Sequence, residues 1–131
     1  MNVTADSNVL IRLVVRDDAV QLRKAQTELA AAQIVCVSIS TLCEIAWVLG
    51  RNYGHSRANI AAAIRAILAS ANVMANRAAA DAGLAMLDVG GDFADGVIAF
   101  EGAALGGGTF ASFDKTAVKL LTAQGVRAML L

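Results

Sequence analysis

One glutamate in this sequence stands where a charge is out of keeping with its neighbours. Glu44 is the only charged residue in the apolar run from Leu42 to Leu49, and no lysine or arginine lies three or four residues from it. A carboxylate buried without a partner is costly, so such a residue indicates a cation-binding role. The alternative interpretation is a solvent-facing glutamate on an amphipathic helix.

Two aspartates, Asp92 and Asp95, are three residues apart and therefore share one face of a helix. Their charges repel unless something positive lies between them, and the same holds for Asp6 and Asp114 if both follow neighbouring strands. A divalent cation removes this repulsion, and a ligand set of carboxylate oxygens favours Mg²⁺ or Mn²⁺ over zinc. Such ions activate water and stabilise the leaving oxygen of a phosphodiester, which predicts nuclease chemistry.

Each aspartate also has a purely structural interpretation as a helix N-cap. An aspartate at a helix start accepts hydrogen bonds from backbone N–H groups that have no partner within the helix. Asp6 would cap the first helix, Asp114 would cap the last, and Asp92 with Asp95 would form a variant of the capping box. The sequence alone leaves both interpretations open for these four residues.

The elements that must position these acids alternate between strand and helix. Short apolar strands are predicted at 3–5, 34–37, 73–74, 109–112 and 126–130. Helices are predicted at about 8–15, 17–32, 40–52, 56–69, 77–87, 92–105 and 114–123, with Ser38 or Ser40 as the cap of the third. This alternation is typical of a parallel sheet with helices on both faces, whose site lies beyond the carboxyl ends of the strands.

The composition narrows the interpretation further. A chain of 131 residues that is 57% apolar can fill the core of one domain. The formal net charge of the chain is zero, so the chain as a whole has no excess of positive charge of the kind that strong nucleic-acid binders carry. A net charge says nothing about local basic patches. Cys36, Cys43 and His55 are too few for a zinc site. No apolar run approaches the roughly 18 residues that a membrane span needs, so the sequence predicts a soluble, cytoplasmic protein.

Four segments together carry a resemblance to a known family. They are Ala5–Arg12, Ser40–Leu49, Gly91–Ala99 and Thr109–Lys115, in that order along the chain. In these segments the chain resembles PIN-domain proteins, and within that family the VapC toxins of bacterial type II toxin–antitoxin systems. The resemblance covers essentially the whole chain and implies a single PIN domain over residues 1–131. It implies an α/β fold, a three-layer α/β/α sandwich with a central five-stranded parallel sheet.

The resemblance also implies a function and a set of site residues. The function is that of a Mg²⁺-dependent or Mn²⁺-dependent endoribonuclease, usually a homodimer, inhibited by a small cognate antitoxin of the VapB kind. Carried over by position, the catalytic acids are Asp6, Glu44, Asp95 and Asp114, and Asp92 joins them as a metal ligand. Asn8 and Ser112 match supporting polar residues, and Arg12 and Lys115 are the candidate RNA contacts.

The chain departs from the family pattern at a few positions. Gly96 follows Asp95 where a larger helix former is common, and we expect it to loosen that helix by roughly 1 kcal/mol relative to alanine. Ser7 replaces the usual threonine and keeps the hydroxyl group. The run of three glycines at 106–108 matches no phosphate-binding loop, because no Gly-Lys-Ser/Thr follows it.

Three other classes of protein compete with this interpretation. A phosphohydrolase of the haloacid-dehalogenase kind would use Asp6 as nucleophile, but Asn8 replaces the second aspartate that such enzymes carry. A receiver domain would need paired acids directly after the first strand, whereas Asp17 and Asp18 follow a helix. A non-catalytic PIN-fold binding module would not need the complete set of acids.

Overall fold

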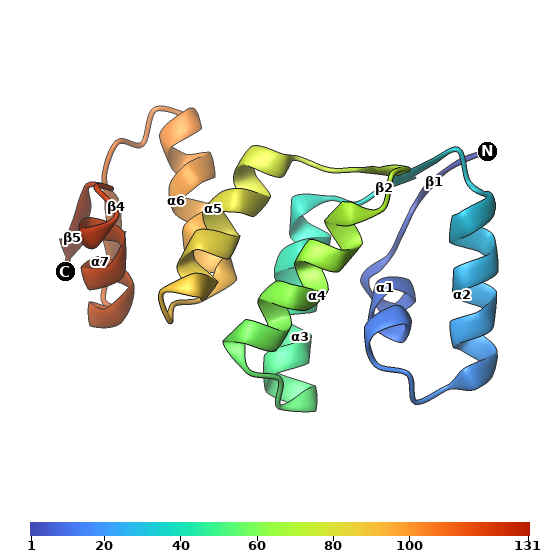
Figure 1. Cartoon of the computed structure of the whole chain (residues 1–131). Coiled ribbons are helices and arrows are strands. Elements are labelled where there is room, and N and C mark those ends of the chain that lie inside the picture. Colours follow the sequence, from blue (N-terminus) through green and yellow to red (C-terminus); the bar gives the residue numbers. More distant parts are fainter. The chain divides into compact units, whose positions relative to one another are not determined.

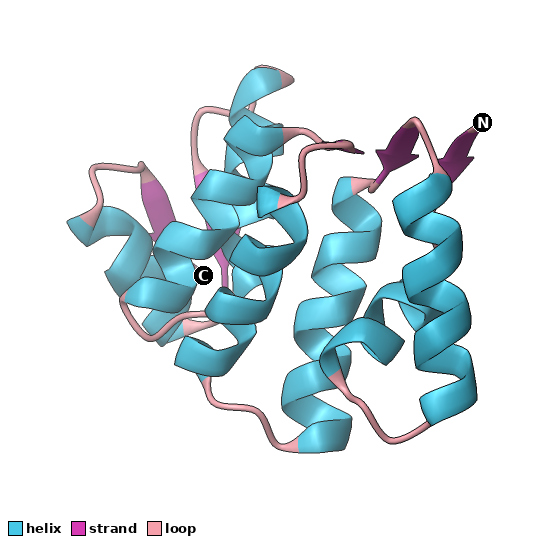
Figure 2. Ribbon diagram, turned by 45° about the vertical axis from the view of Figure 1, so that its right-hand side comes forward, coloured by secondary structure: helices cyan, strands magenta, loops and turns pink.

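Seven helices and five strands alternate along the chain, as the hydrophobic pattern predicts (Figure 1). The computed structural model describes all residues from 1 to 131. They form two units, unit 1 (Met1–Asn76) and unit 2 (Arg77–Leu131). The strands have only two or three residues each, and much longer helices separate most of them (Figure 2). The helices therefore supply most of the packing surface in each unit.

Unit 1 contains a three-stranded parallel sheet and four helices. In chain order these are β1 (Asn2–Thr4), α1 (Ser7–Val14), α2 (Ala19–Ala31), β2 (Ile34–Cys36), α3 (Ile39–Tyr53), α4 (Arg57–Ala69) and β3 (Val73–Met74). The strand order is β1-β2-β3, and Val3, Val35 and Val73 are paired in register across the sheet. Val35 and Val73 are buried, whereas the next row of the pleat, which includes Cys36 and Met74, is exposed.

The core of unit 1 forms along the apolar stripe of α3. Leu42, Ile45 and Leu49 are fully buried at helical spacing, together with Leu10 of α1 and Ile64 of α4. Burial of these side chains is what holds the helices on the sheet, because the strands are too short to supply many hydrogen bonds.

Short polar side chains begin the helices of unit 1. Asp18 accepts hydrogen bonds from the backbone N–H groups of Val20 and Gln21 at the start of α2. The Ser38 hydroxyl accepts one from Thr41 N–H, so Ser38 rather than Ser40 is the cap of α3. At the other end of α3, Gly54 adopts a φ of +65°, the left-handed conformation in which helices commonly end on glycine.

Unit 2 packs three helices with a pair of parallel strands. The elements are α5 (Arg77–Asp88), α6 (Phe93–Ala104), β4 (Phe110–Ser112), α7 (Lys115–Ala123) and β5 (Ala128–Leu130). β4 and β5 pair in parallel from Phe110 opposite Ala128 to Ser112 opposite Leu130. Met86 of α5, Ala99 of α6 and Leu121 of α7 form one buried cluster. Partly buried apolar residues of both strands pack against this cluster, so unit 2 has its own core.

The sheet differs from the predicted one in its pairing. All five strands are present and every pairing is parallel, so the mixed α/β fold with parallel sheets is confirmed. The strands pair as three in unit 1 and two in unit 2, and not as one continuous five-stranded sheet. The physical reason is their length: strands of two or three residues form few ladder hydrogen bonds, so hydrophobic pattern alone does not specify all their partners. The three-layer sandwich and the single domain stay predictions.

The end of α2 is held by one side chain from the segment before β3. The Asn72 amide donates hydrogen bonds to the carbonyl oxygens of Leu29, at 2.9 Å, and Ala32, at 3.0 Å. These carbonyls have no partner within the helix, so Asn72 supplies what the helix end lacks.

We therefore predict that Asn72→Ala lowers the free energy of unfolding by about 1–3 kcal/mol, because two partly buried hydrogen bonds are lost. Urea denaturation followed by circular dichroism measures this change. Asn59→Ala on the exposed face of α4 is the matched control and should change the free energy by no more than about 0.5 kcal/mol. Equal effects of the two substitutions would show that the Asn72 hydrogen bonds do not hold the end of α2.

Candidate active site

Two of the predicted acids act on a third in unit 2. Asp95 lies in the first turn of α6, Asp92 at its N-cap position and Asp114 at the N-cap of α7. The pKa of Asp95 is raised, first by its partial burial, and then by the negative charges of Asp92 and Asp114. The structure therefore brings Asp92 and Asp114 close enough to Asp95 for their charges to repel its carboxylate.

Nothing in the structure compensates the charge of Asp95. Its carboxylate has no hydrogen bond and no cationic neighbour, and the two charges that act on it are both negative. A partly buried acid in such surroundings costs stability while it is ionised. Asp95 is therefore the residue of this cluster whose position calls most strongly for a cation.

The interpretation as helix N-caps is correct for Asp6 and Asp114 and wrong for Asp92. The Asp114 carboxylate accepts a hydrogen bond from Ala117 N–H at 3.0 Å, and the Ser112 hydroxyl accepts one from Asp114 N–H at 2.9 Å. Asp6 occupies the N-cap of α1 and accepts a hydrogen bond from Ser7 N–H. Asp92 occupies the N-cap position of α6, but its side chain makes no capping hydrogen bond. The predicted capping box of Asp92 with Asp95 is therefore wrong.

Glu44 lies exposed on α3. The interpretation of Glu44 as a solvent-facing glutamate is therefore correct, and the prediction that its carboxylate is buried is wrong. The reason is the rotation of the helix: the buried stripe runs through Leu42, Ile45 and Leu49, and Glu44 falls outside it. Trp47 lies on the exposed side too, with 62% of its surface accessible. An apolar sequence around an acid is therefore not evidence of burial when some of its apolar residues are themselves exposed.

The five acids come from both units. Asp6 and Glu44 belong to unit 1, and Asp92, Asp95 and Asp114 belong to unit 2. No group of three or more histidine, cysteine, aspartate or glutamate side chains has an arrangement that could hold a metal ion as it stands. The donor chemistry in unit 2 nevertheless fits a hard cation, because the acids offer only oxygen atoms and their repulsion is uncompensated. Convergence of all five acids on one ion stays a prediction.

Comparison with known families now identifies the fold. A family model described as the PIN domain matches residues 3–120, which is nearly the whole chain. The chain belongs to the PIN-domain family. PIN domains are generally nucleases that depend on a metal ion, so the predicted resemblance is confirmed at the level of the family. A search of curated proteins finds no match to the sequence.

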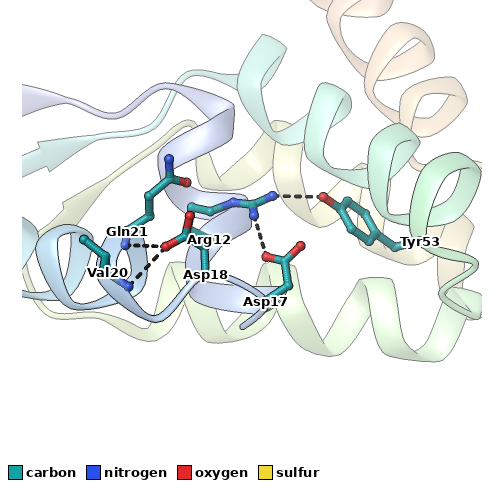
Figure 3. Close-up of polar contacts among 6 residues, drawn as sticks. All are labelled: Arg12, Asp17, Asp18, Val20, Gln21 and Tyr53. Atoms are coloured by element: carbon teal, nitrogen blue, oxygen red, sulfur yellow. Dashed lines mark hydrogen bonds and ion pairs between the residues drawn. The ribbon is translucent and has the colours of Figure 1, made fainter.

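Within this PIN domain, Arg12 is engaged in contacts inside unit 1 (Figure 3). Its Nη1 atom forms an ion pair with Asp17, and its Nη2 atom donates a hydrogen bond to the Tyr53 hydroxyl at 2.9 Å. The bond to Tyr53 is the main cause that raises the pKa of Arg12. Arg12 thus links α1 to the α1–α2 connection and to the end of α3. Lys115, the other predicted RNA contact, is exposed at the start of α7.

Gly96 has a packing role that its sequence position does not reveal. A Cβ atom at this position would lie 2.3 Å from the carbonyl oxygen of Ala82, so glycine is needed for the close approach of α6 to α5. We expected Gly96 to loosen the helix that carries Asp95, and its packing shows the opposite role. Glycine lowers the stability of a helix interior relative to alanine. A glycine within a predicted helix is therefore the sequence signal for a close contact with another helix. No helix of the PIN domain is long and apolar enough to cross a membrane.

The raised pKa of Asp95 predicts how stability depends on pH. The folded chain keeps this proton to a higher pH than the unfolded chain, in which aspartate ionises near its ordinary pKa of about 3.9. The contribution of Asp95 is therefore most favourable below that value and is lost as pH rises through the raised pKa. Asp95→Asn cannot ionise and should gain stability relative to the parent over this rise, in protein free of metal.

Urea midpoints measured at intervals between about pH 3 and pH 7 test this prediction. Asp81→Asn is the matched control, because Asp81 is an exposed acid on α5 of the same unit. Parallel stability curves for Asp95→Asn and the parent over the whole range would contradict the uncompensated charge at Asp95.

Proposed function

We propose that the chain is a Mg²⁺-dependent or Mn²⁺-dependent endoribonuclease that acts as the toxin of a VapBC-like toxin–antitoxin pair. The observation that carries the proposal is the Asp95 carboxylate, which is partly buried and has only negative charges acting on it. A fold that belongs to a family of nucleases and keeps such a cluster is suited to bind a divalent cation.

The chain's own acids would divide the work at such a site. Asp92 and Asp95 offer carboxylate oxygens from the start of α6. Asp114 uses one carboxylate oxygen as a helix cap, which leaves its other oxygen for the site. Asp95 would be the principal ligand in unit 2, and the resemblance of the motif segments assigns a ligand role to Asp6 as well. Ser112 orients the turn before α7 by accepting a hydrogen bond from Asp114 N–H.

A bound Mg²⁺ ion would supply Lewis acidity to the phosphodiester and lower the pKa of a water molecule. Glu44 is exposed and could take the proton of the attacking water, as a general base. Asn8, exposed on α1 two residues after Asp6, would orient an acid or the substrate by hydrogen bonds. The reaction would be hydrolysis of the RNA backbone.

The substrate and the partners rest on the resemblance of the four motif segments. Lys115 is the candidate RNA contact in unit 2. Arg12 is the candidate in unit 1, through the N–H groups that are not used by Asp17 and Tyr53. Unit 1 has more basic than acidic residues, whereas unit 2 has more acidic ones, so the neutral chain does contain an uneven charge distribution. A small VapB-like antitoxin would inhibit a homodimer of the chain in the cytoplasm.

A non-catalytic PIN-fold binding module is the second candidate. It is favoured by one observation, that no three acids are arranged to hold a metal ion as the structure stands. The family match counts against the phosphohydrolase of the haloacid-dehalogenase kind, which has a different fold family.

Cleavage of cellular RNA by the purified chain tests the proposed function. We predict cleavage with Mg²⁺ or Mn²⁺ and none with a chelator, because the carboxylates need the ion to bind phosphate. Asp95→Asn and Asp6→Asn should each reduce the rate by about 100-fold or more, while the fold is kept. Asp81→Asn should cleave at the parent's rate.

Two results would count against the proposal. Cleavage that continues in the chelator, or by Asp95→Asn at the parent's rate, would show that the acids do not form the active site. RNA binding without cleavage by the parent, with either ion, would favour the binding module.

A further inference from the structure

The two most exposed aromatic side chains both lie beside acids that the sequence assigns to the active site. Trp47 has 62% of its surface accessible and Phe113 has 80%, whereas no other aromatic residue exceeds 39%. Trp47 lies three residues after Glu44 on α3, and Phe113 directly precedes Asp114. Single exposed apolar residues are common on protein surfaces. The pairing of an exposed aromatic ring with an acid in both units is the feature that needs an explanation.

Each of these rings also has a cation close by in the chain that the fold leaves unpaired. On α3, Glu44, Trp47 and Arg51 are spaced by three and four residues, so they share one exposed side of the helix. Lys115 follows Phe113 by two residues, at the start of α7. Neither Arg51 nor Lys115 forms an ion pair or a side-chain hydrogen bond. Each unit thus has an acid, an exposed aromatic ring and an unpaired positive charge close together in the chain.

Hydrogen bonds fix the turn that carries Phe113. The Ser112 carbonyl accepts a hydrogen bond from Leu131 N–H at 2.9 Å, and the Ser112 hydroxyl accepts one from Asp114 N–H at 2.9 Å. On the other side of Phe113, the Asp114 carboxylate caps α7 by accepting a hydrogen bond from Ala117 N–H. The backbone is therefore held before and after the Phe113 ring.

The backbone that carries Trp47 is fixed by packing. Ile45, Ala46 and Leu49 lie on either side of Trp47 in the sequence, and none of them is more than 8% exposed. Their burial fixes the rotation of α3 and turns the indole ring towards solvent. An aromatic ring on such a support loses little conformational freedom when a ligand stacks on it.

An exposed aromatic ring beside an unpaired cation suits an unpaired nucleotide. Bases outside a duplex stack on aromatic side chains, while arginine or lysine contacts the neighbouring phosphates. The centre of a protein–protein interface is instead depleted of charged residues, which differs from the surroundings of Trp47 and Phe113. The charges beside the two rings therefore favour RNA over a second protein chain as the ligand.

We propose that Trp47 and Phe113 each stack on a nucleobase of the RNA substrate, with Arg51 and Lys115 as the contacts to its phosphates. The inference rests on the proposed function, because the acids beside the rings are those assigned to catalysis. It adds a requirement to that function: the nucleotides bound at both rings must be unpaired, since a base inside a duplex offers no free face.

The fluorescence of Trp47 tests the first stacking position directly. Trp47 is the only tryptophan of the chain, and a base stacked on its indole ring quenches the emission. The probe is a single-stranded RNA of about ten nucleotides, added in the presence of a chelator so that it is not cleaved. We predict saturable quenching by this strand. The same sequence as a duplex, and an abasic ribose-phosphate chain of equal length, should not quench.

Substitutions test both positions through the anisotropy of the labelled strand. Phe113→Leu and Trp47→Leu keep an apolar side chain and remove the ring, so each should bind the strand about 5- to 50-fold more weakly. Phe113→Tyr and Trp47→Phe keep a ring and should bind within about twofold of the parent. Phe100→Leu is the matched control, because Phe100 is 37% exposed on α6, outside the two groups of residues described above. It should bind like the parent.

The outcomes separate this inference from the proposed function. If the parent neither binds nor cleaves RNA, the proposed function is wrong and the stacking role falls with it. If the parent cleaves RNA with Mn²⁺ but shows no quenching, and Phe113→Leu binds like the parent, only the stacking role is overturned. Quenching by the strand without cleavage would support the stacking role and count against catalysis. Unchanged RNA affinity with lost self-association of Trp47→Leu or Phe113→Leu in sedimentation would assign the rings to a protein contact and overturn the inference.

Discussion

The partial burial of Asp95 beside two other carboxylates is the feature of unit 2 on which the proposed chemistry depends. The charges of Asp92 and Asp114 both act on Asp95, and no basic residue offsets the charge of Asp95. The packing of α5, α6 and α7 around Met86, Ala99 and Leu121 holds these acids in place although their charges favour separation. A nuclease that uses a divalent cation needs this arrangement, because the ion supplies the missing charge only when it is bound.

The sequence predicted the elements well, because the cues are local. Strand and helix positions follow from hydrophobic periodicity, and Asp6, Ser38 and Asp114 form caps that the sequence offered as candidates. The resemblance to the PIN-domain family is confirmed as well, because the family model matches residues 3–120. Pairing of the strands was less predictable, since strands of two or three residues leave their partners to longer-range packing.

Side-chain environments were the part that sequence could not supply. Glu44 was expected in an apolar setting and is exposed, because the rotation of α3 depends on which of its apolar residues pack inward. For Asp92 the sequence leaves open a helix cap or a metal ligand, and its side chain makes no capping hydrogen bond, which depends on side-chain geometry. Gly96 was expected to loosen its helix, and its close contact with Ala82 shows that packing between helices decides its role. Each of these errors concerns a contact between segments that periodicity does not describe.

A crystal structure of the chain grown with Mn²⁺ tests the central claim most directly. Anomalous scattering from manganese locates the ion without reference to the protein coordinates. We predict a peak bound by the Asp95 carboxylate, with at least one of Asp92 and Asp114 as a further ligand. An ordered structure at millimolar Mn²⁺ with no peak at Asp95, or with that carboxylate paired to a basic side chain, would contradict the account.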